Sequence, residues 1–365
     1  MDNLQIRYIY QPQLFENKEI LFQYPSAKEI ESFNSLKLEK MQRILVPSSV
    51  KKNVLDSAGL IEFKDYIYEQ YINKKLVIIY GNCHTTVISA YLNGCREFNE
   101  EYVIYEIKPI HTITNSNYFN IPVFKYCDLF IHQSIQNKNR YGEEYCSERV
   151  IEKLNPNCRI LSIPNVYHLP ICFFPQYSSK SEFKRRDGSA VFFRDKLLDA
   201  ASEKGWSYRK TVHDYWDCKH FKKEELDDKL MKFLKKVEER EKEWDIKCLE
   251  FIKENYQKNQ LFYDPNHPTN FFLKYISEEI LKELEISFDR KEWDKINPHS
   301  LTGYQMPILP EVKENFKMVF KENDEFRKDS YCKVRLGKMG GGMIISSSIL
   351  LVHGKMKMLK KLVIV

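Results

Sequence analysis

The chain has 365 residues, 43% of them hydrophobic and 14% aromatic, so it has enough apolar material for a sizeable core. Its mean hydropathy of −0.52 indicates a soluble globular protein and excludes a disordered one. The net charge of +6 arises at the C-terminus: residues 331–365 hold seven Lys or Arg and no Asp or Glu, which leaves 50 basic against 51 acidic side chains before them. A nucleic-acid-binding protein would instead spread basic residues over its folded surface, so we exclude that class.

The nine cysteines show no C-x-x-C spacing, which argues against zinc-finger and thioredoxin-like motifs. No cluster of His, Cys and carboxylates has the spacing of a metal site, so no metal is expected. The first ten residues lack the basic start and apolar run of a secretory signal. We therefore expect free thiols and a cytoplasmic location, with the inner face of a membrane as a further option.

The apolar pattern predicts three regions. Residues 1–74 have apolar residues at three- and four-residue spacing over 29–44 and 49–72, which predicts an N-terminal helical region. Residues 75–330 are predicted to form an α/β domain. Residues 331–365 combine basic side chains with an apolar run about half as long as the ~20 residues of a membrane span. This tail is expected either to contact a membrane peripherally or to lack a fixed fold.

Short apolar strands alternate with helices in the predicted α/β domain. Strands are expected at 75–80, 102–107, 127–132 and 159–163, and helices at 85–92, 143–154 and 268–284. This alternation predicts a parallel sheet covered on both faces, that is, a three-layer αβα fold with helical additions. One addition is a charged helical insertion at about 222–258, whose eleven basic and eleven acidic residues accompany one apolar stripe.

A polar turn, Gly81-Asn82-Cys83-His84, follows the first of these strands and precedes a helix. Gly81 permits a sharp turn, so Cys83 is expected at the first turn of the helix. Unpaired N–H groups and the positive helix end favour a thiolate there and can stabilise an oxyanion. Cys83 is therefore a candidate nucleophile; the alternative is a structural cysteine buried at the end of a strand.

A second polar pattern, Asp264-Pro265-Asn266-His267-Pro268, lies just before the helix predicted at 268–284. A carboxylate three residues before an imidazole can hold one ring nitrogen and leave the other to act as a base. The alternative is an Asp that caps the helix and a His on the surface.

The two blocks together resemble the frame of SGNH-type hydrolases, with Asn82 and Cys83 where that fold has Asp and Ser. The Gly-Asn-Cys variant resembles the WcbI family of polysaccharide-biosynthesis enzymes over about residues 75–284. His84 departs from that family, which usually has Gln after the Cys. The matching segments are Gly81–Cys83, His132–Ser134, Tyr141-Gly142, Ile163–Tyr167 and Asn266–Pro268.

The resemblance implies an SGNH-like fold that binds coenzyme A and transfers an acetyl group during capsular polysaccharide formation. It implies that Cys83 attacks or carries the acyl group, that His267 exchanges the proton, and that Asp264 orients His267. The candidates for oxyanion or substrate binding are Gly81, Asn82, His84, Gln133 and Asn266. The candidates for coenzyme A binding are Arg140, Tyr141, Lys184 and Arg185, although each basic residue could equally lie on a solvated face and Gln133 in a solvated loop.

Three functions remain open from the sequence. The first is transfer of an acyl group, with acetyl preferred, from acyl-coenzyme A to a sugar hydroxyl, either directly or through an acyl-Cys. The second is a glycan esterase or deacetylase of SGNH type. The third is a non-catalytic glycan-assembly protein. The sequence leaves open the acceptor sugar, the acyl group and the oligomeric state.

Overall fold

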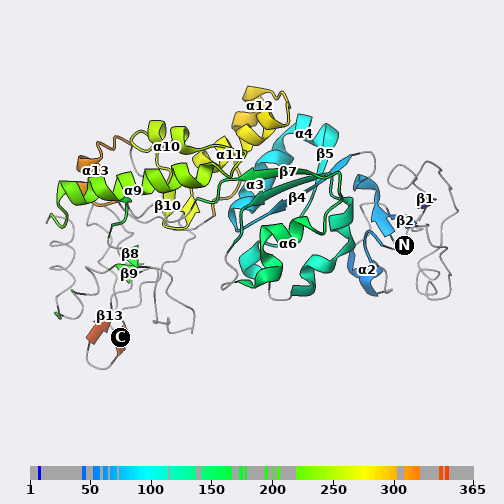
Figure 1. The fold of residues 1–365 in the computed structure, drawn as a ribbon, viewed down its shortest axis with the longest axis horizontal. Coiled ribbons are helices and arrows are strands. Elements are labelled where there is room, and N and C mark those ends of the chain that lie inside the picture. The colour runs from blue at the N-terminus through cyan, green and yellow to red at the C-terminus, as the bar shows by residue number, and fades with distance from the viewer. Residues whose placement is uncertain are drawn as a thin grey trace, which may run out of the picture. The chain divides into compact units, whose positions relative to one another are not determined.

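The computed structural model describes residues 7–9, 43–46, 52–57, 61–64, 66–71, 74–113, 116–136, 141–166, 172–175, 177–178, 194–195, 200, 204–205, 219–301, 308–320, 337–339 and 342–344. The chain divides into two compact units (Figure 1). The first comprises Met1–Ile163 and Ser277–Asn297, and the second Pro164–Ile276 and Pro298–Val365. None of the helices described has the combination of length and hydrophobicity that a membrane span requires.

A four-stranded parallel sheet forms the centre of the first unit, in the order β5-β4-β6-β7. Its strands are β4 (Lys75–Tyr80), β5 (Tyr102–Tyr105), β6 (Leu129–Gln133) and β7 (Arg159–Ile163). The first and last have the predicted bounds, whereas β5 ends two residues earlier and β6 begins two residues later than predicted. The two central strands, β4 and β6, are buried along nearly their whole length, as expected for a parallel sheet covered on both faces, whereas β5 and β7 at the edges are partly exposed.

The strand order of this sheet contains a reversal. From β4 the chain moves to β5 on one side, and it then crosses to β6 on the other side of β4. In open parallel sheets, ligands bind outside the carboxyl ends of the strands at such a reversal. By this rule, a ligand is expected beyond Tyr80 and Gln133, where β4 and β6 end.

Helices cover both faces of the sheet (Figure 1). On one face, alternate residues of β4 such as Ile78 and Tyr80 pack with Phe130 against η4 (Ser116–Asn120), η5 (Pro122–Tyr126), η6 (Glu143–Tyr145) and α6 (Ser147–Ile151). On the other face lie α3 (His84–Gly94) and α4 (Arg96–Glu101). Tyr91 of α3 contacts Trp293 of α12 (Arg290–Lys295), with ring centroids 5.6 Å apart. The predicted three-layer α/β architecture is confirmed.

The N-terminal region differs from its predicted helices. Here β1 (Arg7–Ile9), β2 (Arg43–Val46) and β3 (Tyr66–Tyr68) form a three-stranded sheet, with α2 (Lys52–Ser57) between the last two. The helical expectation for 29–44 and 49–72 is therefore wrong at β2 and β3. The segments RILV and YIY are rich in β-branched and aromatic residues, and strand pairing overrides their helical spacing. Two 3-10 helices, η2 (Glu69–Tyr71) and η3 (Ile110–Thr112), complete the first unit.

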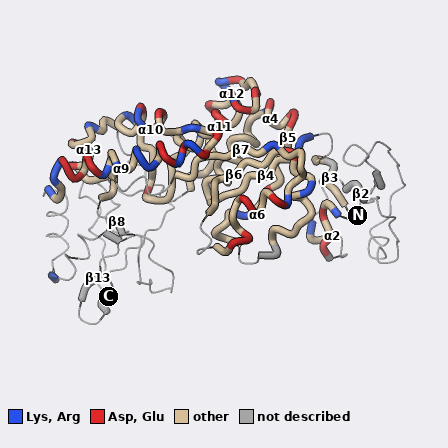
Figure 2. The backbone as a smooth tube through the Cα atoms, in the orientation of Figure 1, with Lys and Arg blue, Asp and Glu red and all other residues tan. Residues whose placement is uncertain are grey.

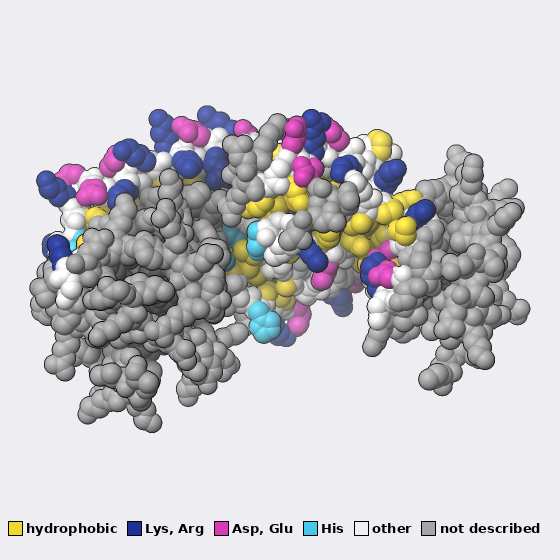
Figure 3. Space-filling view, turned by 90° about the horizontal axis from the view of Figure 1, so that it is seen from below, with side chains coloured by type: hydrophobic (Ala, Val, Ile, Leu, Met, Phe, Trp, Pro, Cys, Tyr) yellow, Lys and Arg dark blue, Asp and Glu magenta, His cyan; other side chains and the backbone are white. Residues whose placement is uncertain are grey.

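The charged insertion forms two helices in the second unit, α9 (Lys223–Glu241) and α10 (Leu249–Asn255). The stripe of α9 is buried, and the Glu241 carboxylate accepts the N–H groups of Cys248 and Leu249 at 2.8 and 2.6 Å, so it caps α10. Acidic and basic residues are interspersed along α9 (Figure 2), and both signs also intermingle among the described side chains on the face seen in Figure 3.

The remaining elements are α11 and the hairpin that contains Asp264 and His267, together with several short helices and strands. α11 (Asn270–Glu283) follows the hairpin of β10 (Phe262–Asp264) and β11 (His267–Pro268), and α13 is Pro310–Asn315. Two small antiparallel pairs are β8 (Tyr177–Ser178) with β9 (Arg194–Asp195), and β12 (Gly337–Met339) with β13 (Gly342–Ile344). The rest of the predicted tail, 331–365, lies outside the described residues.

Candidate active site

Cys83 is the N-cap residue of α3, just beyond the carboxyl end of β4. Its side chain is partly exposed and reduced. Its carbonyl oxygen accepts hydrogen bonds from Thr86 N–H and Oγ1 at 3.2 and 2.7 Å, which fixes the first helical turn. Within the described part of the chain, no acceptor is found for the Cys83 N–H. The Cys83 thiol therefore lies at the positive end of the α3 dipole, and solvent can reach it.

Asn82 organises the start of α3 from the position before Cys83. Its side-chain Oδ1 accepts the His84 N–H at 2.9 Å, and its carbonyl oxygen accepts the Thr85 N–H and Oγ1 at 3.1 and 2.8 Å. Asn82 thus supplies the side-chain cap that Cys83 lacks. The carbonyl oxygen of its amide is used in this turn, and only the amide NH₂ group could donate to an oxyanion.

Gln133, the last residue of β6, joins the two neighbours of Cys83. Its Oε1 accepts the Asn82 N–H at 2.9 Å, and its Nε2 lies 3.2 Å from Nδ1 of His84. Gln133 and His84 are both buried, so neither lies in a solvated loop. Because the backbone N–H identifies Oε1, the amide Nε2 is the donor to the ring, and His84 carries its proton on Nε2.

Gly81 is required by close packing. A Cβ atom at this position would lie 2.4 Å from Gln133 Oε1 and 2.9 Å from Thr85 Cγ2. The Gly81 carbonyl also accepts the Ile110 N–H at 2.8 Å. Its φ is outside the left-handed region, so the predicted role of a turn glycine is replaced by a steric one.

Ser147, at the start of α6, hydrogen-bonds the backbone of Gln133. The sequence did not predict this residue as part of the site. Its hydroxyl accepts the Ile135 N–H at 2.8 Å and donates to the Gln133 carbonyl at 2.9 Å. A Ser fourteen residues after Gln133 carries no local signal of this contact, which only the folded sheet creates.

Replacement of Ser147 by Ala should lower the free energy of unfolding by roughly 1–3 kcal/mol, because it leaves a buried N–H and a buried C=O without their partner. Urea unfolding followed by circular dichroism measures this loss. Ser287→Ala is the matched control, because Ser287 is exposed, and it should stay within about 0.5 kcal/mol of the parent protein. A Ser147→Ala protein as stable as the control would contradict the bridging role.

Asp264 and His267 form a second constellation, in the second unit. The Asp264 carboxylate is fully buried, and its Oδ2 lies 2.7 Å from Nδ1 of His267. Its Oδ1 accepts the N–H groups of Asn266 and His267 at 2.8 and 3.0 Å. The carboxylate is thereby fixed, and it favours the His267 tautomer with the proton on Nδ1 and the basic lone pair on Nε2. The His267 side chain is 22% exposed.

The other predicted residues are placed as follows. Tyr141 is half-buried and packs against the apolar cluster beneath the sheet. The following residue, Gly142, has a φ of 100°. Residues with a Cβ atom rarely adopt this backbone angle, which explains the glycine at this position. Arg140, Lys184 and Arg185 lie outside the described residues.

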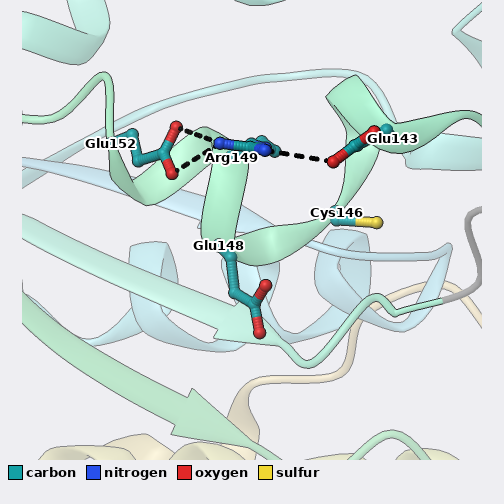
Figure 4. Close-up of a pocket in the computed structure, with 5 residues that line it drawn as sticks. All are labelled: Glu143, Cys146, Glu148, Arg149 and Glu152. Atoms are coloured by element: carbon teal, nitrogen blue, oxygen red, sulfur yellow. Dashed lines mark hydrogen bonds and ion pairs between the residues drawn. The ribbon is translucent and has the colours of Figure 1, made fainter.

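A polar pocket of about 180 Å³ lies beside α6 (Figure 4), and the residues of the Cys83 turn are not among those that line it. Its lining residues are Glu143, Cys146, Glu148, Arg149 and Glu152. Arg149 is already paired with Glu152 and Glu143, at 2.9 and 3.1 Å, and the other charges are acidic. The lining is therefore unsuited to an anionic ligand. In the part of the chain that is described, no group of three or more His, Cys, Asp or Glu could hold a metal.

Comparison with known proteins gives two findings. The family model "Polysaccharide biosynthesis enzyme WcbI" matches residues 76–289. A solved structure of WcbI, described as a novel polysaccharide biosynthesis enzyme in a native form without a disulfide bond between coenzyme A and a cysteine, superposes with a TM-score of 0.55 at 20% identity; the match covers 68% of this chain and 82% of that one. No curated protein gives a significant match. Because the family model covers more than half of the sequence, the chain belongs to the WcbI family of polysaccharide biosynthesis enzymes.

Proposed function

We propose that this protein transfers an acyl group, with acetyl preferred, from acyl-coenzyme A to a sugar hydroxyl during the biosynthesis of a capsular or other surface polysaccharide. One observation carries the proposal: a partly exposed cysteine caps α3 at the strand reversal of a parallel sheet, in a WcbI-family chain that also holds an imidazole bound to a buried carboxylate. The family supports the polysaccharide pathway, and the cysteine and imidazole supply acyl-transfer chemistry.

Coenzyme A is the proposed acyl carrier. The description of the matching WcbI structure states that this form lacks a disulfide bond between coenzyme A and a cysteine. We assign Cys83 as the residue that meets the thiol end of the carrier in this chain. Arg140, Tyr141, Lys184 and Arg185 are the proposed contacts of the rest of coenzyme A. The proposed location is the cytoplasm or the inner face of a membrane, with the tail at 331–365 as the contact.

The proposed chemistry divides between the two constellations. His267 Nε2 takes a proton, either from the Cys83 thiol or from the sugar hydroxyl, while Asp264 stabilises the imidazolium that forms. In the covalent route, the Cys83 thiolate attacks the thioester and coenzyme A leaves as a thiol. The sugar hydroxyl then attacks the acyl-Cys while His267 takes its proton, and the Cys83 sulfur leaves as a thiolate that regains this proton. The Cys83 N–H and the Asn82 amide are the proposed oxyanion donors.

Cys83→Ala should lower acceptor-dependent release of coenzyme A thiol by about 10³-fold or more, since the nucleophile or its oxyanion turn is lost. The assay incubates the full chain with acetyl-coenzyme A, with and without a panel of nucleotide-sugar and oligosaccharide acceptors. Mass spectrometry of a rapidly quenched sample shows whether Cys83 carries an acetyl group. Cys158→Ala, which removes another partly exposed cysteine, is the matched control and should retain activity.

Other outcomes identify the competing functions. Deacetylation of a glycan without coenzyme A would indicate the esterase. Full biological activity of both Cys83→Ala and His267→Ala would indicate a non-catalytic assembly protein and would overturn the proposal.

A further inference from the structure

His84 is the first residue of α3 and directly follows the proposed nucleophile, Cys83. It is 1% exposed, and Gln133 beside it is 0% exposed, whereas Cys83 itself is partly exposed. A side chain buried this deeply acts on the thiol through the groups that it holds in place. The hydrogen bonds around His84 identify these groups.

Three hydrogen bonds link the two neighbours of Cys83 into a closed circuit. Oδ1 of Asn82 accepts the His84 N–H at 2.9 Å, and Oε1 of Gln133 accepts the Asn82 N–H at 2.9 Å. The third bond joins Nε2 of Gln133 to Nδ1 of His84, at 3.2 Å. The circuit therefore runs from the His84 backbone through Asn82 and Gln133 to the His84 ring, and it encloses the turn that carries Cys83.

The direction of each bond in this circuit is determined. A backbone N–H can only donate, so Oε1 of Gln133 must face Asn82 and its NH₂ group must face the ring. Nδ1 of His84 must then accept. If the amide turned over, its NH₂ group would meet the Asn82 N–H, and two donors would oppose each other in a buried site. A buried donor without an acceptor is costly, so the acceptor at Nδ1 fixes the orientation of the amide.

We propose that His84 is a positioning residue for Cys83, which acts through the Gln133 amide. The ring acceptor holds the amide, the amide holds the Asn82 N–H, and this N–H belongs to the peptide that begins the turn. The inference rests on the proposed function in one respect, that Cys83 is the reacting group. The positive helix end acts only within the first turn, so a displacement of Cys83 weakens the stabilisation of its thiolate.

Two substitutions separate the acceptor on the ring from the volume of the ring. In His84→Asn, Oδ1 can take the position of Nδ1 and accept from Gln133, but the lost ring atoms leave a cavity. In His84→Leu, the side chain fills more of the site but places a methyl group where the acceptor was. A residue that only fills the core is replaced at least as well by Leu as by Asn. A positioning residue of the kind proposed is replaced better by Asn.

The test measures the rate at which iodoacetamide alkylates Cys83 in the full chain, from the labelled peptides in mass spectrometry. His84→Leu should slow this reaction roughly five- to tenfold, and His84→Asn should restore most of the parent rate. Cys158 is also partly exposed, precedes the amino end of β7 and serves as an internal reference with an unchanged rate. Labelling of the buried Cys95 would reveal a protein that has lost its fold.

Gln133→Met interrupts the same circuit from the other end, so the test does not depend on the folding of one variant. Met keeps the length of the side chain but can neither accept from Asn82 nor donate to His84. It should slow alkylation of Cys83 about as much as His84→Leu does. In steady-state kinetics, both variants should lower kcat and leave KM for acetyl-coenzyme A little changed.

Alkylation requires neither acyl-coenzyme A nor an acceptor, so its outcome is independent of acyl transfer. The expected alkylation rates in a protein that transfers no acyl group would support the positioning role and reject the proposed function. A folded His84→Leu protein whose Cys83 reacts as fast as that of His84→Asn would overturn the inference, as would a folded Gln133→Met protein with the parent rate.

Discussion

Asp264→Asn is expected to lower turnover by roughly 10³- to 10⁴-fold, the loss typical of a catalytic imidazole whose carboxylate is neutralised. Asn can still accept the N–H groups of Asn266 and His267 through its carbonyl oxygen, so the hairpin of β10 and β11 should persist. Its NH₂ group would then face Nδ1 of His267, where Oδ2 now lies 2.7 Å away. The ring would place its proton on Nε2 and would lose the base that the proposed reaction needs.

Asp289→Asn is the matched control for this loss of a carboxylate. Asp289 caps α12 and accepts the N–H groups of Lys291 and Glu292, at 2.7 and 3.4 Å, much as Asp264 accepts its two backbone groups. The control should retain turnover within about twofold, because a cap substitution acts on stability. Steady-state kinetics with acetyl-coenzyme A and an acceptor compares the two variants. If Asp264→Asn turns over as fast as this control, His267 is not the base.

Gly81→Ala is the second substitution with a large expected effect, and it acts through geometry. The added Cβ would meet Gln133 Oε1 at 2.4 Å, and Gln133 is buried, so the amide must move and its bond to the Asn82 N–H must break. We expect a loss of about 1–3 kcal/mol in the free energy of unfolding from overpacking. A displacement of about 1 Å at Cys83 would lower turnover by roughly 10²-fold.

Two further variants separate this effect from general destabilisation. Gly94→Ala, at the other end of α3, places a Cβ 2.8 Å from Cγ2 of the partly buried Ile296 and should lower stability without lowering turnover. In Gly81→Ala combined with Gln133→Ala, the nearer obstacle is removed while Thr85 remains, so the two stability losses should be non-additive by about 0.5–3 kcal/mol. The free energies of unfolding of the parent protein, the two single variants and the double variant are measured in urea. Strict additivity of the two losses would show that Gln133 does not require a glycine at position 81.

Some residues of the candidate site could be predicted from their neighbours in the sequence, and others could not. Asp264 and His267 are three residues apart, so their pairing follows from chain geometry and could be predicted. Cys83 could be predicted at the start of a helix because a strand, a glycine and a helical pattern adjoin it. Gln133 lies 51 residues from Asn82, and only the pairing of β6 with β4 brings the two together.

The same division holds for the fold. The bounds of β4 follow from a continuous apolar segment, because a strand buried on both faces must be apolar along its length. The N-terminal strands β2 and β3 were not predictable, since their apolar spacing also suits a helix and their partners lie elsewhere in the chain.

By itself, the sequence determined the alternation of strands and helices, the Gly-Asn-Cys turn and the carboxylate–imidazole pair, because each depends on residues that are neighbours in the chain. Only the tertiary structure decided the order of the strands, the bridge from Gln133 to both neighbours of Cys83 and its support by Ser147. Each of these depends on which strands lie side by side, and strand pairing joins segments that no local pattern connects.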